Sequence, residues 1–465
     1  MNDQTEKKRP RTVDDAFREA VKLHREGKHA EAQSLYRLCL VHQPRSVTAW
    51  TNLGASLRAE KKLAPAIACH RKALEVDPNS VTARSNLANA LADIGDAEEA
   101  VAIREVLLKA TPDDWGRIRD LAIAYRGCWR NADAVELIDK AEARLGVDEQ
   151  AQLQRSLAHL MLGNWAEGFA DFEARYAGDE VALPENAPWR RWQGEDLTGK
   201  SIIVLPEQGF GDAILMSRFL PGLKARGASH VSMVVKKPLQ RLMAGVDGVD
   251  KIVAGAKRQD HYDFYTPNMS LPHLVGMGPG GTPPPLPKLT IPNDSRARAA
   301  KVTNSFRDKF KIGVVWTGSL TYRANHRRST SPESFLGLAQ IPGVQLFSLY
   351  KGDAHDDFIA SGMASIIVDS CGHDRDFADT AALIDEMDLM ITTDTAVVHV
   401  AASLGKPVWN MLTWEGFWLY GDQDTTPWYP SMRLFRQPTS GDWDGVFAQV
   451  ENALKIHLKE QRAAV

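Results

Sequence analysis

The feature that most constrains the fold of this chain is a 34-residue period in its first half. Cuts before residues 13, 47, 81, 115 and 149 give five segments, of which the first four are 34 residues long. Small residues recur at one position of four segments, and prolines recur where three segments end: Ala32, Ala66, Ala100, Ala134; Pro44, Pro78, Pro112. Small side chains let two helices approach closely, and proline ends a helix. The period therefore predicts stacked helix pairs that bury their apolar faces on one another.

This pattern resembles the tetratricopeptide repeat, most closely in segments 47–80 and 81–114. The resemblance implies an α-solenoid over 13–182 whose groove binds a protein or a peptide. A spacer or a dimerisation role is the alternative. Residues 1–12 precede the first segment, are rich in charge and are expected to be disordered.

Composition excludes several classes of protein. The net charge of −3 argues against a nucleic-acid partner held by bulk electrostatics. The four cysteines form no C-x-x-C pair, which fits neither a zinc site nor a disulfide framework and favours a reducing compartment. The charged start MNDQTEKKRPRT has no apolar stretch behind it, and no run approaches the ~18 apolar residues of a membrane span. We expect a cytoplasmic protein without a membrane span and without a bound metal.

The helical pattern ends around 177–199, and apolar strand-like runs then alternate with helix-like segments. A proline-rich stretch, 278–292, divides these runs into two sets: 201–205, 230–235, 251–254 and 263–266; then 311–316, 344–350, 365–369, 389–393, 407–412 and 433–436. Apolar strands separated by helices indicate parallel sheets covered on both faces. The fold class is therefore an α-solenoid followed by two Rossmann-like α/β domains, at 195–297 and 306–465. Ligands of such sheets bind where the strands end.

The first strand of the first set is followed by PEQGFGDAIL (206–215). This turn lacks the lysine and Ser/Thr of a P-loop, and it lacks the third glycine of a dinucleotide fingerprint, because Ala213 and Ile214 follow Asp212. Asp212 lies at the start of the following helix. Its position alone leaves two alternatives open, a helix cap and a catalytic carboxylate.

A second motif is ITTDTAVVHVAASLGKPV (391–408), in which a strand ends and Asp394 and Thr395 begin a helix. Thr395 and the free N–H groups of that helix are suited to a phosphate, and His399 lies one turn further in. The alternative is an ordinary capped helix with His399 in the core. One helix terminus contributes only about 0.3–2 kcal/mol per charge, whereas micromolar binding needs about 8 kcal/mol. Cationic side chains are therefore expected nearby.

The loop WTGSLTYRANHRRST (316–330) supplies such side chains at the end of another strand: Arg323, His326, Arg327 and Arg328. Arginine suits phosphate oxygens, although a solvated charged loop is the common alternative. Lys351 follows the next strand and is either a further phosphate ligand or a surface lysine. The aromatic segment 414–431 either stacks on a base or sugar or seals a core or a domain interface.

Together, EQGFGD (207–212), WTGS…RRS (316–329), SLYKG (348–352) and DFADTAALIDEMDLMITTDTAVVHVAASLGKPVW (376–409) resemble the heptosyltransferase-like glycosyltransferases of GT-B fold. The segment 424–446 resembles the branch of that family in which tetratricopeptide repeats precede the catalytic region. The resemblance covers roughly 195–455 for the transferase and 13–175 for the repeats.

The resemblance implies a role for each matching residue. Asp212 would be the base that activates the acceptor hydroxyl, with Gln208, Gly209 and Gly211 forming its acceptor-side loop. The donor-binding residues would be Asp394, Thr395, His399, Arg327, Arg328, Lys351, Gly318 and Ser319. No metal and no cofactor besides a nucleotide-sugar donor are implied.

The predicted function is transfer of a sugar to a Ser or Thr hydroxyl of a protein recruited by the repeats. Flagellin is the best single candidate for that acceptor, with a nonulosonic acid as a possible sugar. One alternative is a heptosyltransferase-like enzyme acting on a lipid or polysaccharide. The other is a non-enzymatic repeat scaffold with a degenerate transferase domain.

Overall fold

A computed structural model describes residues 12–178, 181–184, 187–255, 260–322, 324–372, 374–415 and 417–464. The predicted disorder of 1–12 therefore falls, except for Thr12, outside the described residues. The chain divides into two compact units, the first ending at Ala158 and the second beginning at His159. Each unit is described by itself.

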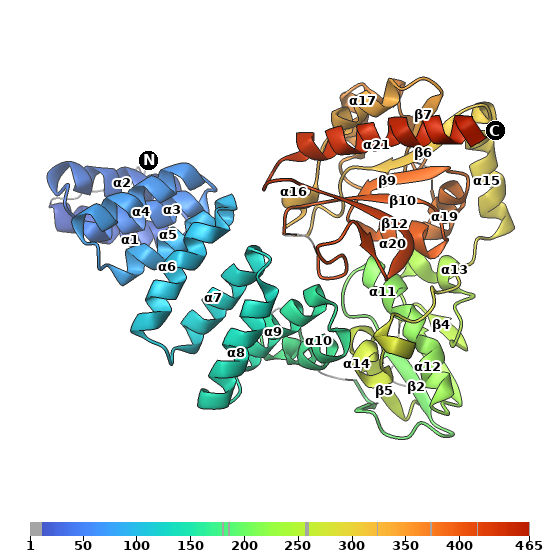
Figure 1. The fold of residues 1–465 in the computed structure, drawn as a ribbon, viewed down its shortest axis with the longest axis horizontal. Helices are drawn as coiled ribbons and strands as arrows, with labels where there is room; N and C mark the ends of the chain where they lie inside the picture. Colours follow the sequence, from blue (N-terminus) through green and yellow to red (C-terminus); the bar gives the residue numbers. More distant parts are fainter. Residues whose placement is uncertain are drawn as a thin grey trace, which may run out of the picture. The chain divides into compact units, whose positions relative to one another are not determined.

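The first half is built from antiparallel helix pairs in the predicted register (Figure 1). The pairs are α1 (Val13–Arg25) with α2 (His29–His42), α3 (Val47–Ala59) with α4 (Leu63–Val76), α5 (Val81–Ile94) with α6 (Ala97–Ala110), and α7 (Trp115–Gly127) with α8 (Asn131–Leu145). Two helices follow along the chain, α9 (Glu149–Leu162), which begins at the fifth cut, and α10 (Trp165–Asp171). The first helix of each pair begins at a residue where the 34-residue period places a cut. The period therefore determined both the type and the register of these elements.

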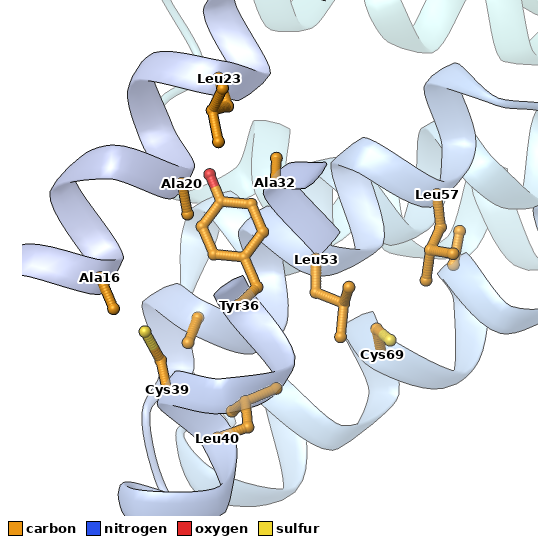
Figure 2. Close-up of a cluster of buried hydrophobic side chains, with 12 residues drawn as sticks. Ala16, Ala20, Leu23, Ala32, Tyr36, Cys39, Leu40, Leu53, Leu57 and Cys69 are labelled. Atoms are coloured by element: carbon orange, nitrogen blue, oxygen red, sulfur yellow. The ribbon is translucent and has the colours of Figure 1, made fainter. Parts of the chain in front are cut away.

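The small recurring residues lie where the helices meet. Ala32, Ala66, Ala100 and Ala134 are each 0% exposed. Figure 2 shows one cluster of this core, in which Tyr36 of α2 lies among Ala20 and Leu23 of α1 and Leu53 of α3. A larger side chain at the alanine positions would hold the paired helices apart, which explains why the period keeps them small.

The second unit begins before the predicted end of the repeats at 182. It includes α10 and the 3-10 helix η1 (Phe172–Ala177), which follow the last repeat helix. Phe169 of α10 contacts the Trp418 and Trp428 rings, with centroids 5.5 and 6.1 Å apart. Aromatic packing thus joins this helical segment to the α/β part of the chain.

The first sheet has, among the described residues, five parallel strands in the order β1-β5-β2-β3-β4. They are β1 (Arg190–Arg191), β2 (Ser201–Leu205), β3 (His230–Val234), β4 (Lys251–Val253) and β5 (Phe264–Pro267). The helices of this part are α11 (Phe210–Met216), α12 (Leu220–Ala225), α13 (Gln240–Met243) and α14 (Leu271–Val275). All four predicted strands are present, and the two-residue edge strand β1 was not predicted.

The second sheet has, within the described ranges, seven strands in the order β11-β12-β10-β9-β6-β7-β8, parallel except for the β11–β12 pair. They are β6 (Phe310–Val315), β7 (Val344–Ser348), β8 (Val368–Asp369), β9 (Leu389–Thr393), β10 (Val408–Leu412), β11 (Thr425–Thr426) and β12 (Tyr429–Arg436). The helices are α15 (Asn293–Thr303), α16 (Asn325–Arg328), α17 (Leu336–Ala339), α18 (His355–Ala360), α19 (Phe377–Asp385), α20 (Ala396–Ser403) and α21 (Trp443–Ala464). The strand predicted at 365–369 keeps only its last two residues, because Met363–Ser365 form a 3-10 turn. The strand predicted at 433–436 begins earlier, at Tyr429.

The two sheets approach each other through α11 and α20, which lie side by side (Figure 1). Each helix follows a strand directly, α11 after β2 and α20 after β9. The carboxyl ends of these two strands therefore lead to one place in the second unit. None of the described helices is long and apolar enough to cross a membrane.

Candidate active site

The contact between α11 and α20 depends on a glycine. A Cβ atom on Gly211 would lie 2.5 Å from His399 Cδ2 and 2.8 Å from His399 Nε2. These distances are shorter than any ordinary contact between non-bonded atoms, so only glycine lets the helices approach this closely. The glycine of the GFGD motif thus brings the neighbouring Asp212 to the helix that begins after Asp394.

Asp212 lies at the N-terminus of α11 and is half-buried. Its Oδ2 accepts a hydrogen bond from the backbone N–H of Gly209 at 2.9 Å, so the side chain does cap its helix. Burial raises the pKa of Asp212 to about 6, against the Gly209 hydrogen bond and with the help of the nearby Asp394 charge. A carboxyl with a pKa near neutrality is suited to taking up a proton, so the cap does not exclude a catalytic role.

Asp394 and Thr395 join β9 to α20. The Tyr420 hydroxyl donates to Asp394 Oδ1 at 2.8 Å. Burial raises the pKa of Asp394, and the Tyr420 hydrogen bond and the charge of Arg328 lower it in part. Thr395 is the N-cap residue of α20 but makes no capping hydrogen bond, and its buried Oγ1 has no partner among the described residues. The start of α20 therefore keeps an unused hydroxyl beside a carboxylate.

His399 is buried and lies between two elements of the second unit. Its Nδ1 is 2.9 Å from the Tyr429 hydroxyl, and its ring packs on Gly211. Burial lowers the pKa of His399 to about 3, and the charge of Arg218 lowers it further. Arg218 is itself 3% exposed and stacks on the Tyr429 ring at 5.1 Å. His399 is therefore a neutral ring in a packed setting, which agrees with the core alternative and leaves its predicted donor contact open.

The basic loop after β6 lies beside Asp394 because Val315 pairs with Thr392 in the sheet. Arg328 is half-buried, stacks on the Tyr322 ring at 4.6 Å and bonds Asn325 at 3.2 Å. Its charge acts on Asp394. Among the described cations of this loop, Arg328 is the one whose charge lowers the pKa of Asp394.

The other predicted residues of this loop lie differently. Arg327 is exposed and forms an ion pair with Glu415 at 3.3 Å. Gly318 is where Arg328 approaches the backbone, since a Cβ there would lie 2.6 Å from Arg328 Nη2. Ser319 is exposed and hydrogen-bonds the hydroxyl of Thr321 at 2.8 Å. His326 is exposed, and Arg323 lies outside the described residues.

Three predicted residues remain. Lys351 is exposed, and its ammonium donates to the backbone carbonyl of Asp374. Gln208 and Gly209 are exposed on the loop before α11. Lys351 is not connected to Asp394 or Thr395 by the contacts described above.

Sequence reasoning missed the side chains that hold this site in place. Tyr420 and Tyr429 belong to the aromatic segment 414–431, for which the sequence predicts no roles of individual residues. Trp428, Tyr420 and Tyr429 are each at most 1% exposed, so these rings seal a core as the alternative prediction held. Arg218 stands in the helix-like run after GFGD, and no local pattern marks it as buried.

The arrangement combines a carboxyl with a pKa near neutrality, an unpartnered hydroxyl at the N-terminus of a helix, and an arginine close by. A proton acceptor and groups that bind phosphate oxygens are the parts needed for transfer from a phosphate ester. No group of three His, Cys, Asp or Glu that could hold a metal occurs among the described residues.

Comparison with known proteins identifies two families in this chain. A model of the tetratricopeptide repeat matches residues 57–125, and a model of glycosyltransferase family 9 (heptosyltransferase) matches residues 351–429. The second range contains Asp394, Thr395 and His399.

A curated relative is protein FlbA of Caulobacter vibrioides, 26% identical over 393 residues. The match covers 78% of this chain and 65% of FlbA. A solved glycosyltransferase family 9 structure from Veillonella parvula is 14% identical, with a TM-score of 0.44, and the match covers 57% of this chain and 99% of that one. MamA from Desulfovibrio magneticus is 19% identical, with a TM-score of 0.33 and coverage of 36% and 97%.

The repeat model falls within the helix pairs, and the transferase model falls within the second sheet. The chain thus carries tetratricopeptide repeats followed by a glycosyltransferase family 9 (heptosyltransferase) domain.

Proposed function

We propose that this protein is a glycosyltransferase that moves a sugar from a nucleotide-activated donor to a Ser or Thr hydroxyl of a protein. The observation that carries the proposal is Asp212, a half-buried carboxyl whose pKa is raised to about 6 and which lies close to Asp394. The repeats would recruit the acceptor. Flagellin is the acceptor we favour, with a nonulosonic acid as a possible sugar. The reason is that the order of repeats and transferase domain in this chain resembles that of flagellin glycosyltransferases.

The proposed reaction is a displacement at the anomeric carbon of the donor. The acceptor oxygen forms a bond to that carbon while the bond from the carbon to the donor phosphate oxygen breaks. The hydroxyl proton passes to Asp212, and the nucleotide leaves with the electron pair. General-base assistance of this kind contributes about 10²–10⁴ in rate.

The leaving phosphate would be held at the start of α20. Thr395 Oγ1 is buried there without a partner, and the N-terminal N–H groups of the helix favour an anion. Arg328 would add a positive charge, because it already acts on the neighbouring Asp394. These groups would stabilise the charge that grows on the phosphate as the bond breaks, with no metal or cofactor in the proposed mechanism.

We place the reaction in the cytoplasm, a location that the free thiols of all four cysteines support. A lipid or polysaccharide acceptor is the second candidate, and the heptosyltransferase description of the matching family model favours it. The repeats would then serve in assembly.

The first experiment is a thermal-shift screen of the full chain against UDP-, GDP-, ADP- and CMP-sugars. We expect one nucleotide class to raise the melting temperature. A response to none of them would contradict the proposal and favour a non-enzymatic scaffold. With the donor known, mass spectrometry of a flagellin and of a lipid acceptor after incubation separates the two acceptor classes.

Two variants then divide binding from chemistry. Asp212→Asn keeps an oxygen for the Gly209 N–H but removes the base, so it should retain the donor-induced shift and lose about 10²–10⁴ of the transfer rate. Thr395→Val should weaken the shift itself. Asp247→Asn, an exposed carboxylate of the same part of the chain, serves as the matched control and should behave as the parent. Near-normal transfer by a folded Asp212→Asn variant would leave Asp212 as a helix cap only.

A further inference from the structure

The loop that leads to Asp212 is held by a buried ion pair with a residue that lies outside both sheets. Arg175 of η1 donates from Nε to Glu207 Oε1 at 2.6 Å and from Nη2 to Glu207 Oε2 at 2.8 Å. The side chains are 2% and 5% exposed. Two parallel hydrogen bonds between a guanidinium and a carboxylate fix the direction as well as the distance of the pair.

The rest of the guanidinium is also satisfied. Arg175 Nη1 donates to the Phe172 carbonyl at 2.9 Å and to Glu173 at 2.8 Å, and Nη2 reaches Ser270 at 2.8 Å. The Tyr176 hydroxyl donates to Glu207 Oε2 at 2.8 Å. Burial alone would lower the pKa of Arg175, but the Glu207 carboxylate holds it above its usual value. The Arg175 guanidinium therefore stays charged in a setting that has little access to water.

Glu207 lies between the end of β2 and the start of α11, five residues before Asp212. The loop is fixed at both of its ends, by Arg175 at Glu207 and by the His399 ring at Gly211. The negative charge of Glu207 is also the last of the causes that raise the pKa of Asp212, after burial and the charge of Asp394. The pair thus bears on both the position and the protonation of Asp212.

We propose that Arg175, in the helical segment that follows the repeats, is a positioning residue for Asp212 and acts through its buried ion pair with Glu207. The role in transfer rests on the function proposed above. The effect of the ion pair on the position of the loop, its mechanical part, does not rest on that function, because it concerns the loop alone.

Hydrogen exchange of the full-length chain tests the mechanical part without any substrate. Arg175→Met should speed exchange of the 207–212 amides at least tenfold, while the amides of β3 and β6 keep their protection. Arg190→Met is the matched control, because Arg190 forms an exposed ion pair with Glu195 at 2.6 Å on the same sheet. Unchanged exchange in 207–212, or faster exchange spread evenly over the second unit, would overturn the proposal.

Arg175→Met leaves a buried carboxylate unpaired and is at risk of misfolding. The double variant Arg175→Met with Glu207→Gln removes both charges of the pair and so leaves neither one unpaired. Hydrogen exchange of the loop amides in this variant then tests the proposal. Faster exchange confined to 207–212 supports the proposal in this variant as well, and exchange at the parental rate overturns it.

The pH profile of transfer separates positioning from a general structural role. Arg175→Met leaves the Glu207 charge uncompensated near Asp212, so the acid limb of the transfer rate should move to higher pH. Glu207→Gln leaves the Arg175 charge and should move it to lower pH. Loss of fold alone would not displace the limb in opposite directions, so shifts in one direction or none would overturn the electrostatic role. Absence of transfer by the parent protein would refute the proposed function and leave the exchange result standing.

Discussion

Gly211→Ala tests the contact that brings the two halves of the candidate site together. The added Cβ would lie 2.5 Å from His399 Cδ2, whereas carbon atoms in contact prefer about 3.5–4.0 Å. The ring must therefore move by roughly 1 Å or the helices must separate. His399 is 6% exposed and tied to the Tyr429 hydroxyl at 2.9 Å, so it has no free space to enter.

Overpacking of this kind costs about 1–3 kcal/mol. Alanine in place of glycine returns up to about 1 kcal/mol in a helix interior, but less here because Gly211 lies in the first turn of α11. We therefore expect the free energy of unfolding to fall by about 1–2 kcal/mol. That corresponds to a loss of roughly 2–5 °C in the calorimetric transition of the second unit, measured in the full chain.

The control is Gly255→Ala, since a Cβ on this exposed glycine meets no atom within 4 Å and the transition should not move. A double-mutant cycle identifies the source of the loss. In a His399→Ala background the ring is gone, so Gly211→Ala should cost almost nothing. An equal cost with and without His399 would refute the assignment of the strain to this contact.

Three further outcomes are expected. Gly54→Ala places a Cβ 2.5 Å from the Cε1 of the buried His70. It should lower the free energy of unfolding of the repeats, measured by calorimetry, by about 1–3 kcal/mol. Gly127→Ala is the control and should leave that free energy unchanged, because its Cβ would lie 3.9 Å from the nearest atom. Burial lowers the pKa of His70 to about 4. Between pH 6.5 and pH 4 the unfolded chain therefore binds more protons than the folded one. The free energy of unfolding should fall by on the order of 3 kcal/mol as the pH is lowered through this range. His70→Phe should remove that slope from the pH dependence of unfolding, and an unchanged slope would assign it elsewhere. Asp394→Asn removes a like charge near Asp212 and should move the acid limb of the transfer rate to lower pH; an unmoved limb would mean that the two carboxyls do not interact.

Local patterns predicted most of the fold. The 34-residue period gave helices that begin at Val13, Val47, Val81 and Trp115, because spacing along one helix pair is a property of neighbouring residues. The apolar runs gave most strands of both sheets within one or two residues. Two strands begin elsewhere than predicted, β8 at Val368 and β12 at Tyr429. The edge strands β1 and β11 were not predicted, because their two residues carry too little pattern to be detected.

The candidate site was predictable only in part. Asp212, Asp394 and Thr395 follow strands directly, and position in the chain was enough to select them. Arg327 and Arg328 are adjacent in sequence, yet one pairs with Glu415 in solvent and the other lies close to Asp394. Which of two neighbouring arginines faces a site depends on the path of the loop, which composition does not specify.

The sequence by itself determined the repeat register, the two sets of strands and the loops that end them. The tertiary structure decided that Asp212 meets a helix almost two hundred residues later, that Gly211 is the point of contact, and that Arg175 reaches Glu207. The physical reason is range. Periodicity and turn chemistry act over a few residues, whereas these contacts form only when separate layers pack, and burial then sets the charge of each carboxyl.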